Sequence, residues 1–211
     1  NEGASSDNSY DAEAKSFGQL ACSDTSRNLI RVFFLQTKLK SQSNQKNIEI
    51  RDIHVVGAGI MGGDIAAWCA LQGFNVTLQD QKEEYIDAAL ERANKLFRKK
   101  IHNEDKCQIV NDRLQSDVKG KGVIKADLII EAIYENIEAK QTLYKELQSK
   151  MKPGALLATN TSSLQLEDLR TVLNEPKRFI GLHFFNPVSM LPLIEVIKCE
   201  DTDQSALELG F

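Results

Sequence analysis

Three glycines lie in the string GAGIMG at the spacing GxGxxG: Gly57, Gly59 and Gly62. In a dinucleotide-binding turn the first glycine permits the tight bend, the second lets the backbone approach a pyrophosphate, and the third lets a helix pack on a strand. The helix that follows offers free N–H groups and the positive end of its dipole to phosphates. Met61 lies inside the same string and joins the candidate cofactor contacts. Taken alone, the pattern is as compatible with a simple turn as with nucleotide binding.

An acidic residue, Asp80, ends the next predicted strand, about 20 residues further along the chain. A carboxylate at this point accepts hydrogen bonds from the adenosine ribose and repels a 2′-phosphate. No arginine adjoins Asp80 in the sequence to favour a 2′-phosphate. The sequence therefore predicts NAD rather than NADP as the cofactor, and a helix cap is the alternative interpretation of Asp80.

His183 lies near the end of the apolar run FIGLHFF, and Asn186-Pro187 follows it. Open α/β sheets bind ligands outside the carboxyl ends of their strands. Two other polar groups follow predicted strands in the same way: Glu131 with Glu135-Asn136, and Asn160 to Ser163. We predict that the three groups form one crevice. Each also has a structural interpretation, because a lone histidine is often a satisfied structural group and NTSS is a ready helix cap.

Strand and helix signals alternate from Ile48 onward. The predicted strands are Ile53–Val56, Asn75–Asp80, a weaker one at Leu114–Asp117, DLIIEAI from Asp127, ALLATN from Ala155, FIGLHFF from Phe179, and Leu193–Cys199. The predicted helices are Ile60–Leu71, Glu83–Lys100, Ile137–Met151 and Leu166–Leu173. This alternation predicts an α/β fold of the Rossmann-like, doubly wound type, with a mostly parallel sheet and helices on both faces.

The chain before Ile48 has a different character. Residues 1–16 are polar and predict a loosely structured start, whereas Asp24–Lys40 has the apolar spacing of an amphipathic helix, with Ser23 as its N-cap. Residues 41–47 have almost nothing to bury and predict a linker. We therefore expect two parts: residues 1–47 and a dinucleotide-binding domain of residues 48–211.

Composition narrows the function further. A chain of 211 residues with 42% hydrophobic residues can bury a core, and its net charge of −4 argues against a nucleic-acid partner. Its apolar runs are far shorter than the roughly 20 residues that span a bilayer. The four cysteines are scattered without metal-ligand spacing, so we expect no metal site and a reducing, intracellular compartment.

Several long strings carry a family resemblance between about Ile53 and Cys199. GAGIMGG, EAIYENIEAKQ, ATNTSSL and GLHFFNPV occur in this order, followed by the predicted strand that contains Glu195. The sequence resembles the L-3-hydroxyacyl-CoA dehydrogenases of fatty-acid β-oxidation. The segment FGQLACSDTSRNLIRVFFLQTKLK is similar to the connecting helix of multifunctional α-subunits, which joins an enoyl-CoA hydratase domain to the dehydrogenase domain.

The resemblance implies an enzyme that uses NAD to oxidise L-3-hydroxyacyl-CoA to 3-ketoacyl-CoA. It assigns His183 as the general acid/base and Glu195 as the carboxylate that orients this histidine and stabilises its charged form. It assigns Ser162 and Asn186 to hold the nicotinamide and the substrate oxygen, both as catalytic and as cofactor-side groups.

Three further residues of the string YENIEAK are implied as cofactor contacts: Glu135, Asn136 and Lys140. A solvated helix lysine is the alternative for Lys140. We expect the family's helical second domain to be missing from this piece, and we therefore expect the piece alone to bind NAD with little turnover.

The implied partners are an acyl-CoA substrate, the C-terminal dehydrogenase domain and the N-terminal hydratase domain of a parent chain, with a thiolase subunit as a further candidate. The bacterial cytoplasm is the expected location, and the mitochondrion and the peroxisome are its alternatives. Two other functions stay open: a non-catalytic dinucleotide-binding module, and a dehydrogenase of free hydroxy acids.

Overall fold

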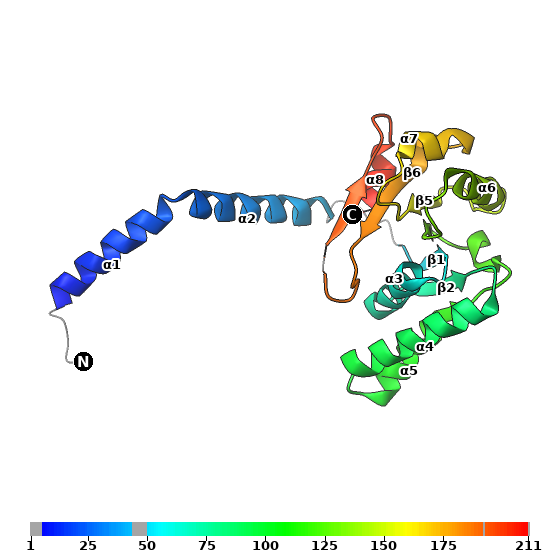
Figure 1. Cartoon of the computed structure of the whole chain (residues 1–211), viewed down its shortest axis with the longest axis horizontal. Helices are drawn as coiled ribbons and strands as arrows, with labels where there is room; N and C mark the ends of the chain where they lie inside the picture. The colour runs from blue at the N-terminus through cyan, green and yellow to red at the C-terminus, as the bar shows by residue number, and fades with distance from the viewer. Residues whose placement is uncertain (1–5, 44–49, 192, 211) are drawn as a thin grey trace. The chain divides into compact units, whose positions relative to one another are not determined.

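The computed structural model describes residues 6–43, 50–191 and 193–210. The chain divides into two compact units, Asn1–Asn47 and Ile48–Phe211. In the first unit, α1 covers Ser6–Ala21 and α2 covers Asp24–Ser43 (Figure 1). The Ser23 hydroxyl accepts a hydrogen bond from the Ser26 backbone N–H at 3.1 Å, which confirms Ser23 as the N-cap of α2.

The first unit contains more helix than its sequence predicts. Residues 6–16, expected to be loose, belong to α1, because a helix that is exposed to solvent on all sides needs no apolar periodicity. Helix α2 also continues through Ser43, because extending a formed helix is far easier than starting one. Residues 41–43 of the predicted linker therefore belong to α2, and residues 44–47 lie outside the described residues.

The second unit is built on one seven-stranded sheet in the order β3-β2-β1-β4-β5-β6-β7. The strands are β1 Asp52–Val56, β2 Asn75–Gln79, β3 Leu114–Ser116, β4 Leu128–Glu131, β5 Leu156–Thr159, β6 Phe179–Phe184 and β7 Ile194–Ile197. All neighbouring strands are parallel except β6 and β7, which run antiparallel. The predicted Rossmann-like, mostly parallel sheet is confirmed.

Helices cover both faces of this sheet (Figure 1). They are α3 Ile60–Gln72, α4 Glu83–Lys100, α5 Glu104–Arg113, α6 Ile137–Gln148, α7 Leu166–Leu169 and α8 Gln204–Gly210. Side chains alternate along each strand. In β4, Leu128 and Ile130 pack with the α3 and α4 side of the core, whereas Ile129 packs with Tyr144 of α6 on the other face.

Two helices of this unit are absent from the sequence prediction. Helix α5 buries only Cys107 and Val110, too few for a periodic signal, and its N-cap Asn103 accepts a hydrogen bond from the Lys106 N–H at 2.9 Å. Helix α8 is seven residues long and buries Ala206 and Leu207. None of the helices in the described ranges is long and apolar enough to cross a membrane.

The order of the strands reverses at β1. The chain proceeds from β1 outward to β2 and β3, then returns to place β4 on the other side of β1. Ligands of open α/β sheets bind at such a switch point, outside the carboxyl ends of the strands. Here the loops after β1 and β4 meet: the Ala132 N–H donates to the Val56 carbonyl at 2.8 Å.

Candidate active site

The glycine-rich turn after β1 is closely packed against the loop after β4. Gly57 has a φ of +105°, and a Cβ atom added there would lie 2.5 Å from the Ala132 carbonyl oxygen. A Cβ atom on Gly62 would collide with the Gly57 carbonyl, whereas one on Gly59 would meet no atom within 4 Å. Gly57 and Gly62 therefore allow the close packing of the turn, because neither position has room for a side chain. At Gly59 the missing side chain leaves open space beside the backbone.

Asp80 holds the same turn from the end of β2. Its Oδ2 accepts a hydrogen bond from the Ala58 N–H at 2.6 Å, and its Oδ1 accepts one from the Gln81 N–H at 2.7 Å. The following helix α4 has Lys82 as its N-cap residue and no side-chain cap. Asp80 is thus no helix cap; it joins the end of β2 to the glycine-rich turn.

A cavity of about 1030 Å³ opens beside this turn. Its walls come from the turn itself, the end of β2, helix α4 and the start of α6. Gly57, Gly59, Asp80 and Asn136 are among the residues that line it. Asn136 is also the N-cap of α6, because its Oδ1 accepts a hydrogen bond from the Ala139 N–H at 2.8 Å.

A second cavity, of about 570 Å³, adjoins the first and shares Gly59 and Tyr134 with it. Helix α3, strand β6 and the loops after β4, β5 and β6 supply the sequence-predicted residues that line this cavity: Met61, His183, Glu135, Ser162 and Asn186. The predicted crevice is therefore present. Asn160 also lines the cavity. It connects the loop after β5 to the end of β6, because its Oδ1 accepts a hydrogen bond from the Phe184 N–H at 2.9 Å.

His183 and Glu195 form a hydrogen-bonded pair at the edge of this cavity. They face each other in the antiparallel register of β6 and β7, and His183 Nδ1 lies 2.8 Å from Glu195 Oε2. The ring of His183 also packs edge-on against Phe185, with 4.6 Å between the ring centroids. The His183 side chain is 19% exposed and that of Glu195 is 53% exposed. This bond uses Nδ1 and leaves Nε2 for proton transfer to and from another molecule.

Beneath the crevice lies a buried polar cluster centred on Glu131. Its Oε1 accepts a hydrogen bond from Lys140 Nζ at 2.6 Å, and its Oε2 accepts from the hydroxyls of Tyr144 and Thr159, each at 2.7 Å. Glu131 and Lys140 are 0% and 1% exposed. Burial and the neighbouring Glu131 carboxylate both raise the pKa of Tyr144, so its hydroxyl stays a proton donor.

Glu135 connects this buried cluster to the crevice. Its Oε2 lies 3.4 Å from Lys140 Nζ, and its carboxylate accepts hydrogen bonds from the Thr161 hydroxyl at 2.9 Å and the Ser162 N–H at 3.0 Å. Burial alone would raise the pKa of Glu135, but these hydrogen bonds and the Lys140 charge outweigh it and lower the pKa. Glu135 therefore stays ionised and links the loops after β4 and β5.

The structure buries Lys140 and Glu131 away from both cavities, and Asn136 lines the larger cavity but not the crevice. Lys140 is not a solvated lysine: its ammonium is enclosed between Glu131, Glu135 and the Ile133 carbonyl. Glu131 points in the same direction as Ile129, into the core beneath α6, because side chains two apart on a strand share a face.

A charged residue, Arg92, also lines the larger cavity and is absent from the sequence prediction. Arg92 of α4 donates from Nη2 to the Gly59 carbonyl at 3.0 Å. No arginine adjoins Asp80 in the sequence, yet the packing of α4 on α3 brings Arg92 into the same cavity. A charged residue on an amphipathic helix gives no sign in the sequence of such a contact.

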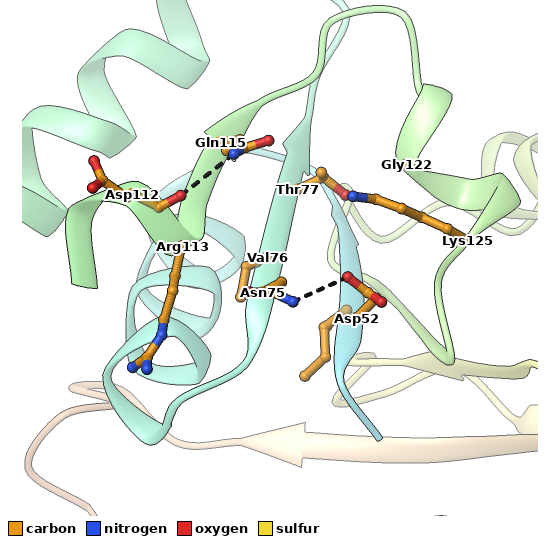
Figure 2. A pocket seen from close by; sticks show the side chains of 10 residues that line it. Asp52, Asn75, Val76, Thr77, Asp112, Arg113, Gln115, Gly122 and Lys125 are labelled. Atoms are coloured by element: carbon orange, nitrogen blue, oxygen red, sulfur yellow. Dashed lines mark hydrogen bonds between the residues drawn. The ribbon is translucent and has the colours of Figure 1, made fainter. Parts of the chain in front are cut away.

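A third cavity, of about 80 Å³, lies at the opposite end of the strands (Figure 2). Asp52 and Asn75, the first residues of β1 and β2, line it, and the Asn75 side chain donates to Asp52 at 3.3 Å. Ligands of this fold class bind at the carboxyl ends of the strands. The small cavity therefore has no place in the candidate site.

Comparison with known families decides the assignment. The family described as 3-hydroxyacyl-CoA dehydrogenase, NAD binding domain, matches residues 52–211. The chain belongs to this family. Membership of this NAD-binding domain family agrees with the glycine-rich turn, with Asp80 at the end of β2 and with the crevice around His183.

Relatives of the 3-hydroxyacyl-CoA dehydrogenase family resemble the chain over most of its length. A protein of Psychrobacter arcticus named fatty acid oxidation complex subunit alpha is 33% identical over 208 residues, which is 95% of this chain and 29% of that protein. A relative of the same name from Pseudomonas aeruginosa is 33% identical over 211 residues and is covered to the same extent. The chain thus spans less than a third of these relatives.

Solved structures of the family share the fold. The 3-hydroxybutyryl-CoA dehydrogenase of Escherichia coli is 30% identical and superposes with a TM-score of 0.74, covering 77% of this chain and 35% of that one. The (S)-3-hydroxybutyryl-CoA dehydrogenase of Ralstonia eutropha is 29% identical, with a TM-score of 0.71 and coverages of 77% and 61%.

The residues of this 3-hydroxyacyl-CoA dehydrogenase domain fit NAD, its family's cofactor. The open space at Gly59 permits close approach of a pyrophosphate to the backbone, and the N-terminus of α3 presents its free N–H groups there. Asp80 places a carboxylate in the wall of the same cavity. The larger cavity thus combines the backbone and the acidic group that a dinucleotide requires.

Proposed function

We propose that the protein to which this chain belongs oxidises L-3-hydroxyacyl-CoA to 3-ketoacyl-CoA with NAD in fatty-acid β-oxidation, and that this chain is its NAD-binding domain. The observation that carries the proposal is the pair His183–Glu195, joined at 2.8 Å. It borders a crevice that adjoins the cavity suited to NAD. A proton acceptor beside a dinucleotide groove is what alcohol oxidation needs.

In the proposed mechanism His183 acts as the general base. Its Nε2 takes the proton of the substrate hydroxyl, while Nδ1 donates to Glu195 and so holds the ring in one tautomer and orientation. The Glu195 carboxylate stabilises the imidazolium that forms. Bound NAD supplies the hydride acceptor for C3 of the substrate. In the reverse direction, the imidazolium returns the proton to the carbonyl oxygen.

Ser162 and Asn186 are proposed to orient the reacting groups. Both line the cavity of His183, and their hydroxyl and amide groups can bond the substrate oxygen or the nicotinamide amide. Met61 contributes an apolar wall on the same side. Holding the reactants in one geometry is a large share of the rate enhancement in such reactions.

The remaining contacts are proposed to hold the cofactor. Gly57 and Gly59 form the pyrophosphate turn, and Gly62 allows α3 to pack against it. Glu135 faces the crevice as an ionised group, and Lys140 acts through Glu135, since its own ammonium is buried. Asn136, at the start of α6, lines the cofactor cavity.

Asp80 is expected to select NADH over NADPH. Its carboxylate can accept hydrogen bonds from a ribose and repels a 2′-phosphate, so we expect NADH to bind at least about tenfold more tightly than NADPH. Asp80→Asn keeps an acceptor for the Ala58 N–H but removes the charge, and should narrow this preference. Fluorescence titration of the chain with each cofactor measures both. Asp87→Asn, on exposed surface of α4, is the matched control. Equal affinities in the unaltered chain would remove this role from Asp80.

The location and the assembly of the whole protein are part of the proposal. Bacterial relatives named as subunits of a fatty acid oxidation complex support a bacterial cytoplasmic enzyme, with the mitochondrion or the peroxisome as alternatives. We propose that the chain works beside a C-terminal dehydrogenase domain and an N-terminal hydratase domain of one polypeptide. A thiolase subunit is the proposed further partner.

The substrate class is tested with the full-length protein. Steady-state formation of NADH is measured with L-3-hydroxybutyryl-CoA and, in parallel, with free 3-hydroxybutyrate. We expect the thioester to be oxidised and the free acid to react at least about a hundredfold less efficiently, because the whole of the CoA binding energy is lost. Efficient oxidation of the free acid would favour a hydroxy-acid dehydrogenase instead.

A further inference from the structure

Arg92 lies where a dinucleotide would place its phosphates. It projects from α4 onto the first turn of α3, and its Nη2 donates to the Gly59 carbonyl at 3.0 Å. An added Cβ atom on Gly63 would lie 2.8 Å from the same Nη2, so the absence of a side chain at Gly63 lets the guanidinium rest against α3. Arg92 and Gly59 both line the cavity of about 1030 Å³.

Most donors of this guanidinium are unused. Within residues 50–191 and 193–210, the buried Nε of Arg92 has no hydrogen-bond partner, and Nη1 makes no hydrogen bond. Oδ1 of Asp64 lies 3.9 Å from Nε, close enough for an ion pair but too far for a hydrogen bond. The Arg92 side chain is 40% exposed. An anchored, partly exposed arginine with free N–H groups on Nη1 and Nη2 is suited to bind an anion.

We propose that Arg92 binds the pyrophosphate of the cofactor, adding a charged side chain to the glycine-rich turn and the N-terminus of α3. The inference rests on the proposed NAD-binding function of this cavity. The anchor on Gly59 favours the pyrophosphate over a 2′-phosphate, because Gly59 belongs to the turn that approaches the pyrophosphate. A 2′-phosphate would instead meet the Asp80 carboxylate.

The removal of Arg92 leaves the turn itself intact. The Gly59 carbonyl also accepts a hydrogen bond from the Gly63 N–H at 3.0 Å, so it stays satisfied without the arginine. A variant that lacks the guanidinium should therefore lose phosphate binding while keeping the adenosine part of the site. A phosphate contact would therefore weaken the binding of phosphate-containing ligands alone, whereas a structural role would weaken the binding of adenosine as well.

The test measures the binding of NADH and NADPH by fluorescence, and of ADP and adenosine as competitors for NADH, with the 211-residue chain and its Arg92→Met variant. We expect the variant to bind ADP and NADH about tenfold more weakly and adenosine unchanged, since a charge-assisted hydrogen bond to phosphate is lost. Arg92→Lys should retain part of the affinity because it keeps the charge without the planar fork. Arg98→Met, an exposed residue of the same helix, is the control for loss of charge.

Three other results would overturn the inference. Equal ADP affinities in Arg92→Met and the unaltered chain would mean that Arg92 does not touch the phosphates. An equal loss for ADP and adenosine would assign it a structural role, and a loss confined to NADPH would assign it to the 2′ position. Failure of the unaltered chain to bind NADH or ADP would instead count against the proposed function itself.

Discussion

His183→Gln in the full-length protein should lower turnover by about 10²- to 10⁴-fold, the range expected when a general base is lost. Glutamine approximates the size of the ring but cannot take the proton of the substrate hydroxyl. The affinity for NADH should change less than about twofold, because the proposed phosphate and ribose contacts lie in the other cavity. Steady-state kinetics and NADH titration measure the two effects separately.

Glu195→Gln should also slow turnover, though less than His183→Gln does. The Glu195 side chain is 53% exposed, so solvent screens its charge and can partly replace it beside the imidazolium. His102→Gln, at an exposed histidine outside both cavities, is the matched control and should leave turnover unchanged. Turnover at the unaltered rate in both the His183 and the Glu195 variants would require another route for the proton.

Lys140→Met should destabilise the dinucleotide-binding domain by about 3–5 kcal/mol, because it leaves the Glu131 carboxylate buried without its counter-charge. The hydroxyls of Tyr144 and Thr159 continue to donate hydrogen bonds to Glu131. Because these bonds partly stabilise the buried carboxylate, we expect a loss of stability near the lower end of this range. For a domain of this size the loss lowers the melting temperature by on the order of 10 °C. Thermal unfolding followed by circular dichroism measures it.

The double variant Glu131→Gln/Lys140→Met distinguishes the stability contributed by the Glu131–Lys140 ion pair from that contributed by the neighbouring hydrogen bonds. It removes both charges, so it should recover a large part of the lost stability, as replacement of a whole buried pair costs less than loss of one partner. Lys145→Met, at an exposed position of the same helix, should change stability by less than about 0.5 kcal/mol. A Lys140→Met variant as stable as Lys145→Met would mean that the ion pair contributes nothing.

The fold of the second unit follows closely from its sequence because most of its strands and helices carry enough regularly spaced apolar residues to leave a periodic signal. Helix α4 was predicted to cover Glu83–Lys100, and it does so, since it buries Ile86, Ala89, Ala93 and Phe97 at helical spacing. Helices α1 and α5 gave no such signal: α1 is polar and exposed, and α5 buries two residues. An element with few apolar residues leaves no periodic signal in the sequence.

The candidate site was predictable where it depends on strand ends and unpredictable where it depends on packing between elements. Ser162 and Asn186 follow strands and His183 lies near the end of one, so the topology of a parallel sheet alone brings them to one crevice. The contact of Arg92 with Gly59 depends on how α4 packs on α3. The burial of Lys140 depends on Glu131 pointing inward, which a short run of sequence letters cannot indicate.

The most direct test of the account follows the hydrogen on C3 of the substrate. The full-length protein is incubated with NAD and L-3-hydroxybutyryl-CoA that carries deuterium at C3, and the products are analysed by mass spectrometry. We predict that the deuterium appears in the reduced cofactor, one atom for each 3-ketoacyl-CoA formed, because C3 lies beside the cofactor when His183 takes the hydroxyl proton. A protein that binds NADH yet transfers no deuterium from this substrate would contradict the proposed reaction and favour a non-catalytic dinucleotide-binding module.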